Sequence, residues 1–322
     1  MGLVTHAHIN GLLAVHKPTG MVSKDISRWL VRRLGKLKIG HVGTLDPAAS
    51  GVLPVLLGRA TKLQDYLLEM PKTYEFDIRF GSETDTLDLD GQVVRETPWE
   101  HITAAQLSAS ITDFVGDIVQ TPPIYSAIKY QGRPLYDYAR AGAEAAGKVP
   151  LEALKRTVSV SRFELLGFSP GLGTFQVTCS KGTYVRTLAK DLAEKVGSCG
   201  TLARLVRTKS SGVDIGAAHG LEAIEQRLDT FGSLVTPMER IEIGLRRWRS
   251  SRSGLTAMLR SGQQVVLEVT EYLGGCLDPE EGSPEGWGRP LYLLNEQGDA
   301  FGIGTVRSQE SGRIAIVMKK GL

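Results

Sequence analysis

Cysteine is scarce in this chain of 322 residues, and its three copies form no recognisable set. Cys179, Cys199 and Cys276 are odd in number and widely spaced, with no C-x-x-C pair and no histidine close by. Structural disulfides need paired cysteines, and structural zinc sites need closely spaced cysteine and histidine ligands. The sequence therefore predicts neither disulfides nor a metal site.

A long uncharged apolar run is also absent, and residues 1–10 lack the charged, apolar and small-residue segments of a leader peptide. Mean hydropathy is −0.08, and the 42% of hydrophobic residues suffice for a packed core. These properties predict a folded, soluble, cytoplasmic protein with no membrane partner. The length indicates one large domain with an appendage, or two domains.

Neither sign of charge dominates the chain. A formal net charge of +3 and a pI of about 8.7 permit a polyanionic partner without requiring one. Local basic clusters lie at Arg28, Arg32, Arg33, Lys36 and Lys38, and again at Arg246, Arg247, Arg249 and Arg252. Because charge runs are usually solvated surface, the clusters alone favour nucleic acid only weakly.

Glycine and proline gather in the stretch from Gly40 to Leu63, GHVGTLDPAASGVLPVLLGRATKL, which holds a single carboxylate, Asp46. This composition predicts a loop that continues to Arg59, where a helical pattern begins. Pro47 restricts the residue before it to extended backbone, and glycines let the backbone approach a ligand. An aimed carboxylate in a loop suits catalysis, but composition alone is equally consistent with a turn in which Asp46 caps backbone amides.

Two elements are predicted before this stretch. Residues 12–20, LLAVHKPTG, indicate a short strand that runs into a turn, and Ser23 is the predicted N-cap of a helix that Gly35 ends. Ile26, Leu30 and Leu34 recur at helical spacing in this segment. The basic residues on the other face of the helix are placed to follow phosphates.

Two half-buried strands are predicted after it. In residues 72–80, KTYEFDIRF, apolar and polar side chains alternate from Tyr74 onward, and residues 175–179 alternate in the same way. Taken alone, Tyr74 is better explained as a core aromatic at a strand end. Between the strands, the acidic turn of residues 81–91 contains Asp88, which can position basic groups.

A helix that follows Lys181 and Gly182 places Tyr184 and Arg186 on its first turn. The helix dipole favours anions at that end, so Arg186 gains nothing from it. This position predicts a carboxylate partner for Arg186.

Tyrosines and basic residues alternate in residues 116–142, a combination typical of RNA binding, where rings stack on bases and cations meet phosphates. Near residue 248 the composition changes, and residues 248–254, WRSSRSG, indicate a linker. Four short strand-like runs follow, at residues 265–269, 290–295, 301–306 and 314–318. They predict a small β-barrel, interrupted by a long acidic insertion at residues 276–290.

Several of these segments resemble motifs of one family. The stretch GHVGTLDPAASGVLPVLLGRATK, the KP-x-G turn, KGTYVRTL and LVRTKSSG are all similar to motifs of the TruB-type pseudouridine synthases, which act on the T-loop uridine at position 55 of tRNA. The resemblance implies an α+β pseudouridine synthase fold, a mixed and largely antiparallel sheet flanked by helices, with a small C-terminal PUA-like β-barrel. It implies a catalytic domain at 1–247, with an RNA-gripping insertion at about 120–155, and an RNA-binding domain at 248–322.

The resemblance also implies roles for single residues. Asp46 is the catalytic acid, and Arg186 pairs with it and keeps it ionised. Tyr74 stacks on the target base, Tyr184 lies beside the nucleotide, and Leu205 lines the base pocket. His41 fills the space that the flipped base vacates, although for this residue alone a loop histidine bonded to backbone is the likelier explanation.

Pseudouridine formation moves ribose from N1 to C5 of the same uracil, so no atoms enter or leave and no cofactor is expected. The implied substrate is the T-arm stem-loop of tRNA, bound by a monomer without an obligatory protein partner. One alternative is a non-catalytic RNA-binding or tRNA-folding factor. A small-molecule enzyme with a phosphate-binding loop is disfavoured because G-x-x-x-x-G-K-[ST] and G-x-G-x-x-G are missing.

Overall fold

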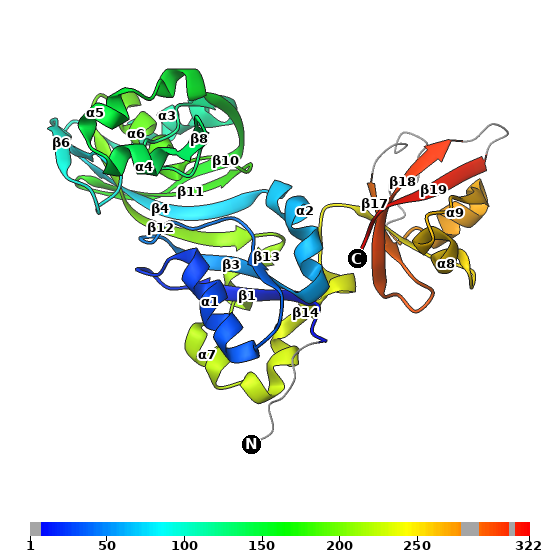
Figure 1. The fold of residues 1–322 in the computed structure, drawn as a ribbon. Helices are drawn as coiled ribbons and strands as arrows, with labels where there is room; N and C mark the ends of the chain where they lie inside the picture. Colours follow the sequence, from blue (N-terminus) through cyan, green and yellow to red (C-terminus); the bar gives the residue numbers. More distant parts are fainter. Residues whose placement is uncertain (1–7, 278–289, 309–312) are drawn as a thin grey trace.

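A ten-stranded mixed sheet forms the body of the molecule in the computed structural model, which describes residues 8–277, 290–308 and 313–322 (Figure 1). Its main path runs β14-β1-β3-β12-β4-β11-β10-β7, with β2 paired to β3 and β13 to β12. The strand pairs are antiparallel apart from β3 with β12. The strands are β1 (Gly11–Lys17), β2 (Ile39–His41), β3 (Ser50–Leu57), β4 (Lys72–Phe80), β7 (Gly116–Gln120), β10 (Arg156–Ser169), β11 (Leu172–Cys179), β12 (Gly200–Ser210), β13 (Val213–Asp214) and β14 (Val235–Pro237).

Helices cover this sheet in two groups, one beside each half of its strand order (Figure 1). α1 (Ser23–Leu34) and α7 (Leu221–Glu225) lie beside β1, β3 and β14, and α1 buries Ile26, Leu30 and Leu34 there. The other group lies near β4, β10 and β11 and consists of α3 (Ala104–Ser110), α4 (Leu135–Arg140), α5 (Ala143–Gly147) and α6 (Val185–Lys195). α2 (Gln64–Glu69) lies between this sheet and the C-terminal part.

The C-terminal part is a five-stranded sheet in the order β15-β17-β18-β19-β16. Its elements are β15 (Arg246–Arg249), α8 (Leu255–Arg260), β16 (Val265–Glu268), α9 (Val269–Gly275), β17 (Pro290–Leu294), β18 (Ala300–Ser308) and β19 (Arg313–Gly321). Tyr292 and Leu322 pack with Leu56 and Leu63 in one apolar cluster, so this sheet is attached to the first one. The predicted fold class, with a mixed sheet, flanking helices and a small PUA-like β-domain, is confirmed.

The prediction of a loop between Gly40 and Arg59 is wrong in its second half, where β3 is a buried strand. Leu53 and Leu56 pack on opposite faces of the sheet, which accounts for the continuous apolar run. On one side of β3, pairing with β12 ends at Gly51 and pairing with β2 begins at Val55. Pro54 lies between these two pairings, so the strand tolerates a residue that has no N–H to donate on this side.

The prediction that Ser23 caps the first helix is also wrong. Val22 occupies the N-cap position without a side-chain cap, and the Ser23 hydroxyl instead donates to Leu45 O and accepts from Leu45 N, both at 2.9 Å. Gly35 does end the helix, with φ 74°. Ser23 therefore ties α1 to the residue that precedes Asp46.

The linker predicted at residues 248–254 is wrong at its start. Trp248 is fully buried in β15, and its indole N–H donates to Tyr272 O at 3.2 Å. The chain passes from one sheet to the other between β14 and β15, and the division into domains at residue 248 stays a prediction. Most of the acidic insertion and the start of the chain, at residues 278–289 and 1–7, lie outside the described residues.

Within the part of the chain that the structure describes, none of the helices combines the length and the apolar character that crossing a membrane requires.

Replacing Trp248 distinguishes a buried strand from a linker. We expect Trp248→Ala to lower the free energy of unfolding by about 3–5 kcal/mol, because it removes a large core side chain and leaves a cavity. The neighbouring Arg249 is exposed, so Arg249→Ala is the control and should stay within ~0.5 kcal/mol. Urea unfolding, monitored by far-UV circular dichroism because this signal does not rely on tryptophan, measures the stability of both variants. Equal midpoints for the two variants would contradict the assignment of Trp248 to a buried strand.

Candidate active site

Asp46 lies in the loop between β2 and β3 and points toward solvent on one side, with its side chain 44% exposed. Its carbonyl accepts a hydrogen bond from Ala49 N at 3.1 Å, which closes a turn. The next carbonyl, of Pro47, accepts from Gly20 N at 2.8 Å and from Lys17 Nζ at 3.3 Å. The backbone around Asp46 is therefore fixed while the carboxylate stays accessible.

Arg186, on the first turn of α6, is the ion-pair partner of Asp46. The two side chains meet at 2.9 Å between Nη2 and Oδ2, and Arg186 is only 6% exposed. The guanidinium also donates to Thr86 O and Tyr125 O, each at 3.0 Å. These two carbonyls fix the planar group so that it presents one N–H to Asp46. The prediction of a carboxylate partner for Arg186 is confirmed.

A polar turn of residues 84–91 supplies the second acid near Arg186. Asp88 Oδ2 lies 3.9 Å from Arg186 Nε, and its other oxygen accepts from Thr86 Oγ1 at 2.6 Å and Asp90 N at 3.2 Å. Leu87 in this turn has φ 64°, a left-handed conformation that side chains rarely adopt. The strained turn aims both Asp88 and the Thr86 carbonyl at the guanidinium, as the sequence predicted for Asp88.

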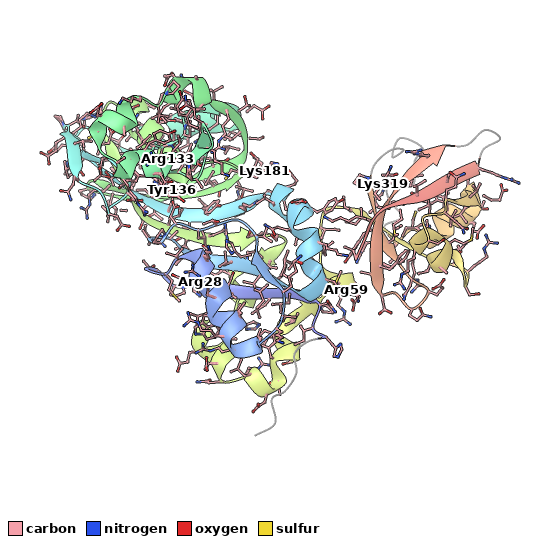
Figure 2. The ribbon with its side chains drawn as sticks, viewed as in Figure 1. Arg28, Arg59, Arg133, Tyr136, Lys181 and Lys319 are labelled. Atoms are coloured by element: carbon pink, nitrogen blue, oxygen red, sulfur yellow. The ribbon has the colours of Figure 1, made fainter. Side chains whose placement is uncertain are left out.

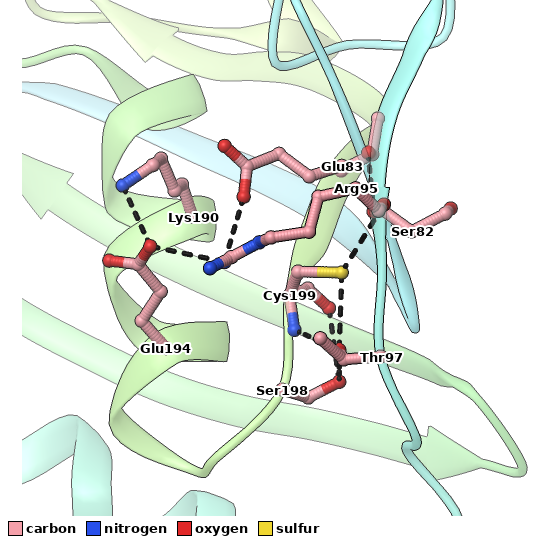
Figure 3. Close-up of polar contacts among 9 residues, drawn as sticks. Ser82, Glu83, Arg95, Thr97, Lys190, Glu194, Ser198 and Cys199 are labelled. Carbon is pink, nitrogen blue, oxygen red and sulfur yellow. Dashed lines mark hydrogen bonds and ion pairs between the residues drawn. The ribbon is translucent and has the colours of Figure 1, made fainter.

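A surface network attaches this turn to the helix that carries Arg186 (Figure 3). The turn connects β5 (Ser82–Thr84) and β6 (Val93–Glu96), and Arg95 on β6 pairs with Glu83 at 2.9 Å and with Glu194 of α6 at 3.1 Å. Figure 3 also shows Thr97 and Cys199 in hydrogen-bond contact across the same junction. The hairpin and α6 are thereby held in register, and with them the partners of Arg186.

Tyr184 is the N-cap residue of α6 and is fixed through its backbone. The buried side chain of Gln120 accepts from Tyr184 N at 3.0 Å and donates to Tyr184 O at 3.2 Å. On its ring lies the Arg156 guanidinium, 4.6 Å from the centroid. Tyr184 thus lies two residues from Arg186, in a fixed orientation.

Tyr74 and Leu205 lie on adjacent strands, on the face of the sheet that packs against α6. In the β4–β12 register Tyr74 is opposite Arg207 and Phe76 is opposite Leu205, and both predicted residues pack against the same apolar cluster. Leu205 and Asp46 line a common hollow of about 30 Å³. A hollow of this size holds about one water molecule, so a base must widen it to enter.

His41 ends β2 and lies on the α1 side of the loop. Its ring nitrogens are 3.2 Å from Ser27 Oγ and 3.3 Å from Thr44 Oγ1. Burial, and next the charge of Arg207, lower the pKa of His41. The structure therefore brings Asp46, Arg186 and Leu205 together, with Tyr184 alongside, and places His41 on the neighbouring side of the same loop.

Three buried cations that were not predicted from the sequence lie under the loop: Lys17, Lys72 and Arg207. Arg207 donates to Val52 O at 2.7 Å and Gly43 O at 2.9 Å. Lys72 donates to two backbone carbonyls at 2.7 Å, and Lys17 donates to two more. Backbone carbonyls thus accept hydrogen bonds from all three cations.

Glycine is required where Arg207 passes the loop. Gly43 has φ 70°, and a Cβ there would lie 3.2 Å from Arg207 Nη1. At Gly51, with φ 105°, a Cβ would lie 2.3 Å from the Arg207 carbonyl oxygen. The glycines thus allow the backbone to pass close to a buried arginine, and their predicted approach to a ligand stays a prediction.

Burial lowers the pKa of both lysines. Burial lowers the pKa of Lys17 to about 8; the Asp46 carboxylate opposes this shift and Arg207 adds to it. Burial and then Arg207 lower the pKa of Lys72 to about 8. Burial raises the pKa of the Tyr74 phenol, which is hydrogen-bonded to Arg207. Asp46 therefore lies above a group of buried basic side chains.

A pattern in the sequence could have revealed these residues. Arg207 is two residues from Leu205 on β12, so both side chains lie on the inward face of the strand. A cation at an inward position needs buried hydrogen-bond acceptors. Lys17 is the lysine of the KP-x-G turn. Gln120 gave no such signal, because only the fold brings it to Tyr184.

A metal-binding arrangement does not occur among the described residues, where no three His, Cys, Asp or Glu side chains cluster in a way that could hold an ion.

Comparison with known proteins identifies a family model and many relatives. Residues 31–185 match the model of the TruB family pseudouridylate synthase (N terminal domain). A "tRNA pseudouridine synthase B" from Lactobacillus delbrueckii is 38% identical over 76% of this chain and 85% of its own. A relative of the same name from Chromobacterium violaceum is 45% identical over 68% of this chain and 69% of its own. Another, from Ralstonia nicotianae, is 39% identical over 84% of this chain and 93% of its own.

Solved structures with the same fold cover nearly the whole chain. The chain of the "Crystal Structure of a Cbf5-Nop10-Gar1 Complex" is 21% identical and matches all of this chain and 87% of its own with a TM-score of 0.71. A structure of an H/ACA RNP bound to a substrate RNA containing 2'-deoxyuridine gives 0.68 at 20% identity, over 97% of this chain and 84% of its own. The fold is therefore shared over both sheets.

The lowered lysine pKa values predict how stability changes with pH. Lys17 and Lys72 change from the ordinary 10.5 to about 8 on folding. Between pH 8 and 10.5 the unfolded chain therefore binds more protons, and stability rises with pH. We expect the free energy of unfolding of wild type, relative to Lys17→Met or Lys72→Met, to increase from pH 8 to pH 10. Urea titrations at each pH measure it, and a difference that is flat or falls would contradict the burial of charged lysines.

Proposed function

Because this chain belongs to the TruB family of pseudouridylate synthases, we propose that it converts the T-loop uridine at position 55 of tRNA to pseudouridine. The relatives that carry the name tRNA pseudouridine synthase B support tRNA as the substrate. Aromatic and basic residues of the segment 120–155 suit RNA, and Figure 2 labels Arg133 and Tyr136 there. The chain acts in this proposal as a monomer, without an obligatory protein partner.

One observation carries the proposal, the 2.9 Å contact of a half-exposed Asp46 with a buried Arg186. A carboxylate that attacks a sugar or removes a proton must be ionised and reachable by RNA. Arg186 contacts this carboxylate, and its own position is fixed by hydrogen bonds to two backbone carbonyls. Asp46 is the nucleophile or base in this mechanism.

The isomerisation breaks the bond between C1′ and N1 of uridine and forms a bond between C1′ and C5. The proton on C5 is lost to water, and N1 gains a proton, so the atoms balance without a co-reactant. The cut base must stay in place between these steps. Leu205 lines the hollow beside Asp46, and Tyr74 presents its ring from the neighbouring strand to stack on the uracil.

Uridine in a stacked loop must first be flipped outward, at a cost of a few kcal/mol. His41 in this proposal takes the vacated space, and its position on the loop of Asp46, bonded to Thr44, supports this role. Tyr184 contacts the flipped nucleotide beside Arg186. Residues 1–247 then form the catalytic domain, with the gripping insertion at about 120–155, and residues 248–322 form an RNA-binding module.

Replacing the carboxylate tests the chemistry directly. We expect Asp46→Asn to reduce tritium release from a C5-labelled T-arm RNA by at least about 10³-fold, or ~4 kcal/mol of barrier. RNA binding, measured by filter retention, should remain within a few-fold because the amide keeps the shape. Asp90→Asn is the matched control, since Asp90 is exposed and contributes only its backbone N–H to Asp88.

Two results would overturn the proposal in different ways. Full turnover in Asp46→Asn would remove Asp46 from the mechanism. Binding of tRNA by wild type without tritium release would leave a non-catalytic RNA-binding or tRNA-folding factor.

A further inference from the structure

A basic groove runs along one flank of α1 and ends at His41. It is a hollow of about 640 Å³ between α1, β2 and Gln64. Its lining residues are Lys24, Ser27, Arg28, Val31, Arg32, Ile39, Gly40, His41 and Gln64. Three of them are cations, and none of these described lining residues is an acid. The groove therefore offers positive charge next to a polar and partly apolar wall.

The three cations form a row with the spacing of a helix. Lys24, Arg28 and Arg32 follow one another every four residues, which corresponds to about 6 Å of rise per step and 12 Å in all. A nucleic acid strand carries one negative charge per nucleotide, at a similar separation along an extended backbone. A row of this kind matches successive phosphates of one strand.

The other flank of the same helix carries no comparable charge. Arg33 lies over the Trp29 ring, 3.9 Å from its centroid, and is ion-paired with Glu225 of α7. The cluster of five basic residues in the sequence is therefore divided by the helix. Arg28 does contact Asp25 at 2.9 Å, but both side chains are about half exposed, so this pair is weak and leaves Arg28 able to bind a phosphate.

The row of cations is tied rigidly to the loop of Asp46. Ser23, next to Lys24, makes two hydrogen bonds to Leu45, the residue before Asp46. At the other wall, His41 bonds both Ser27 of α1 and Thr44 of the loop. A strand that lies in the groove is thereby placed at a fixed distance from the carboxylate. Figure 2 shows Arg28 on α1 below the long strands of the sheet, and Arg133 and Tyr136 above them in the same view.

We propose that this groove binds phosphates of the RNA strand that carries the target uridine, and that it sets which nucleotide reaches Asp46. The inference rests on the proposed function for its substrate. The strand follows Lys24, Arg28 and Arg32 and enters the site past His41, which occupies the position between the groove and the loop.

Salt dependence of RNA binding tests the groove. We expect the double variant Arg28→Gln/Arg32→Gln to lose two phosphate contacts, which lowers the slope of log affinity against log salt by about 1.5. The matched control is Lys36→Gln/Lys38→Gln, which removes the same charge from exposed residues outside the groove and should leave the slope unchanged. The probe is a T-arm stem-loop RNA, titrated between 50 and 400 mM KCl, and thermal melting confirms that both variants fold.

Kinetics separate a groove from a general charge effect. The groove variant should raise KM for the stem-loop at least ten-fold more than it lowers kcat, and the control should change neither. Equal slopes for the two double variants would overturn the groove. Wild-type tritium release reports separately on the proposed function: its absence refutes the isomerase, whereas its presence with equal slopes refutes only the groove.

Discussion

The ion pair between Asp46 and Arg186 is the contact on which the rest of the site depends. Arg186 is buried, and a buried guanidinium destabilises the fold unless its donors are satisfied. Carbonyls from two other segments, at Thr86 and Tyr125, satisfy it together with Asp46. The loop after β2, the turn after β5 and the segment after β7 are therefore bound to one side chain, and the geometry of each constrains the others.

Support for this arrangement comes from outside the site. The hairpin that carries Thr86 is attached to α6 by Arg95 and Glu194, and α6 is attached to β7 by Gln120. Ser23 attaches α1 to the loop. Each attachment joins residues that are far apart in the chain, so the position of Arg186 relative to Asp46 is a property of the whole first sheet and not of either motif.

The sequence predicted the elements that follow a clear period. The alternation in residues 72–80 and the helical spacing after Lys181 correspond to β4 and α6, and the odd placement of Arg186 at a helix start predicted its partner. β3 was missed because a strand buried on both faces has no alternation and this one contains a proline. Trp248 was missed because Arg249 and then a serine-rich segment ending in Gly254 follow it, although its own side chain lies in the core of the second sheet.

The buried cations show most clearly why part of the site could not be predicted. A sequence records the charge of Arg207, Arg186 and Arg28 identically, but burial gives each a different role. Arg207 is fully buried and stabilises the loop by donating a hydrogen bond to Gly43 O. Arg186 is buried beside the half-exposed Asp46 and forms an ion pair with its carboxylate. Arg28 stays exposed. Asp46 lies where buried positive charge meets solvent, which explains how one carboxylate can be both held by the protein and open to RNA.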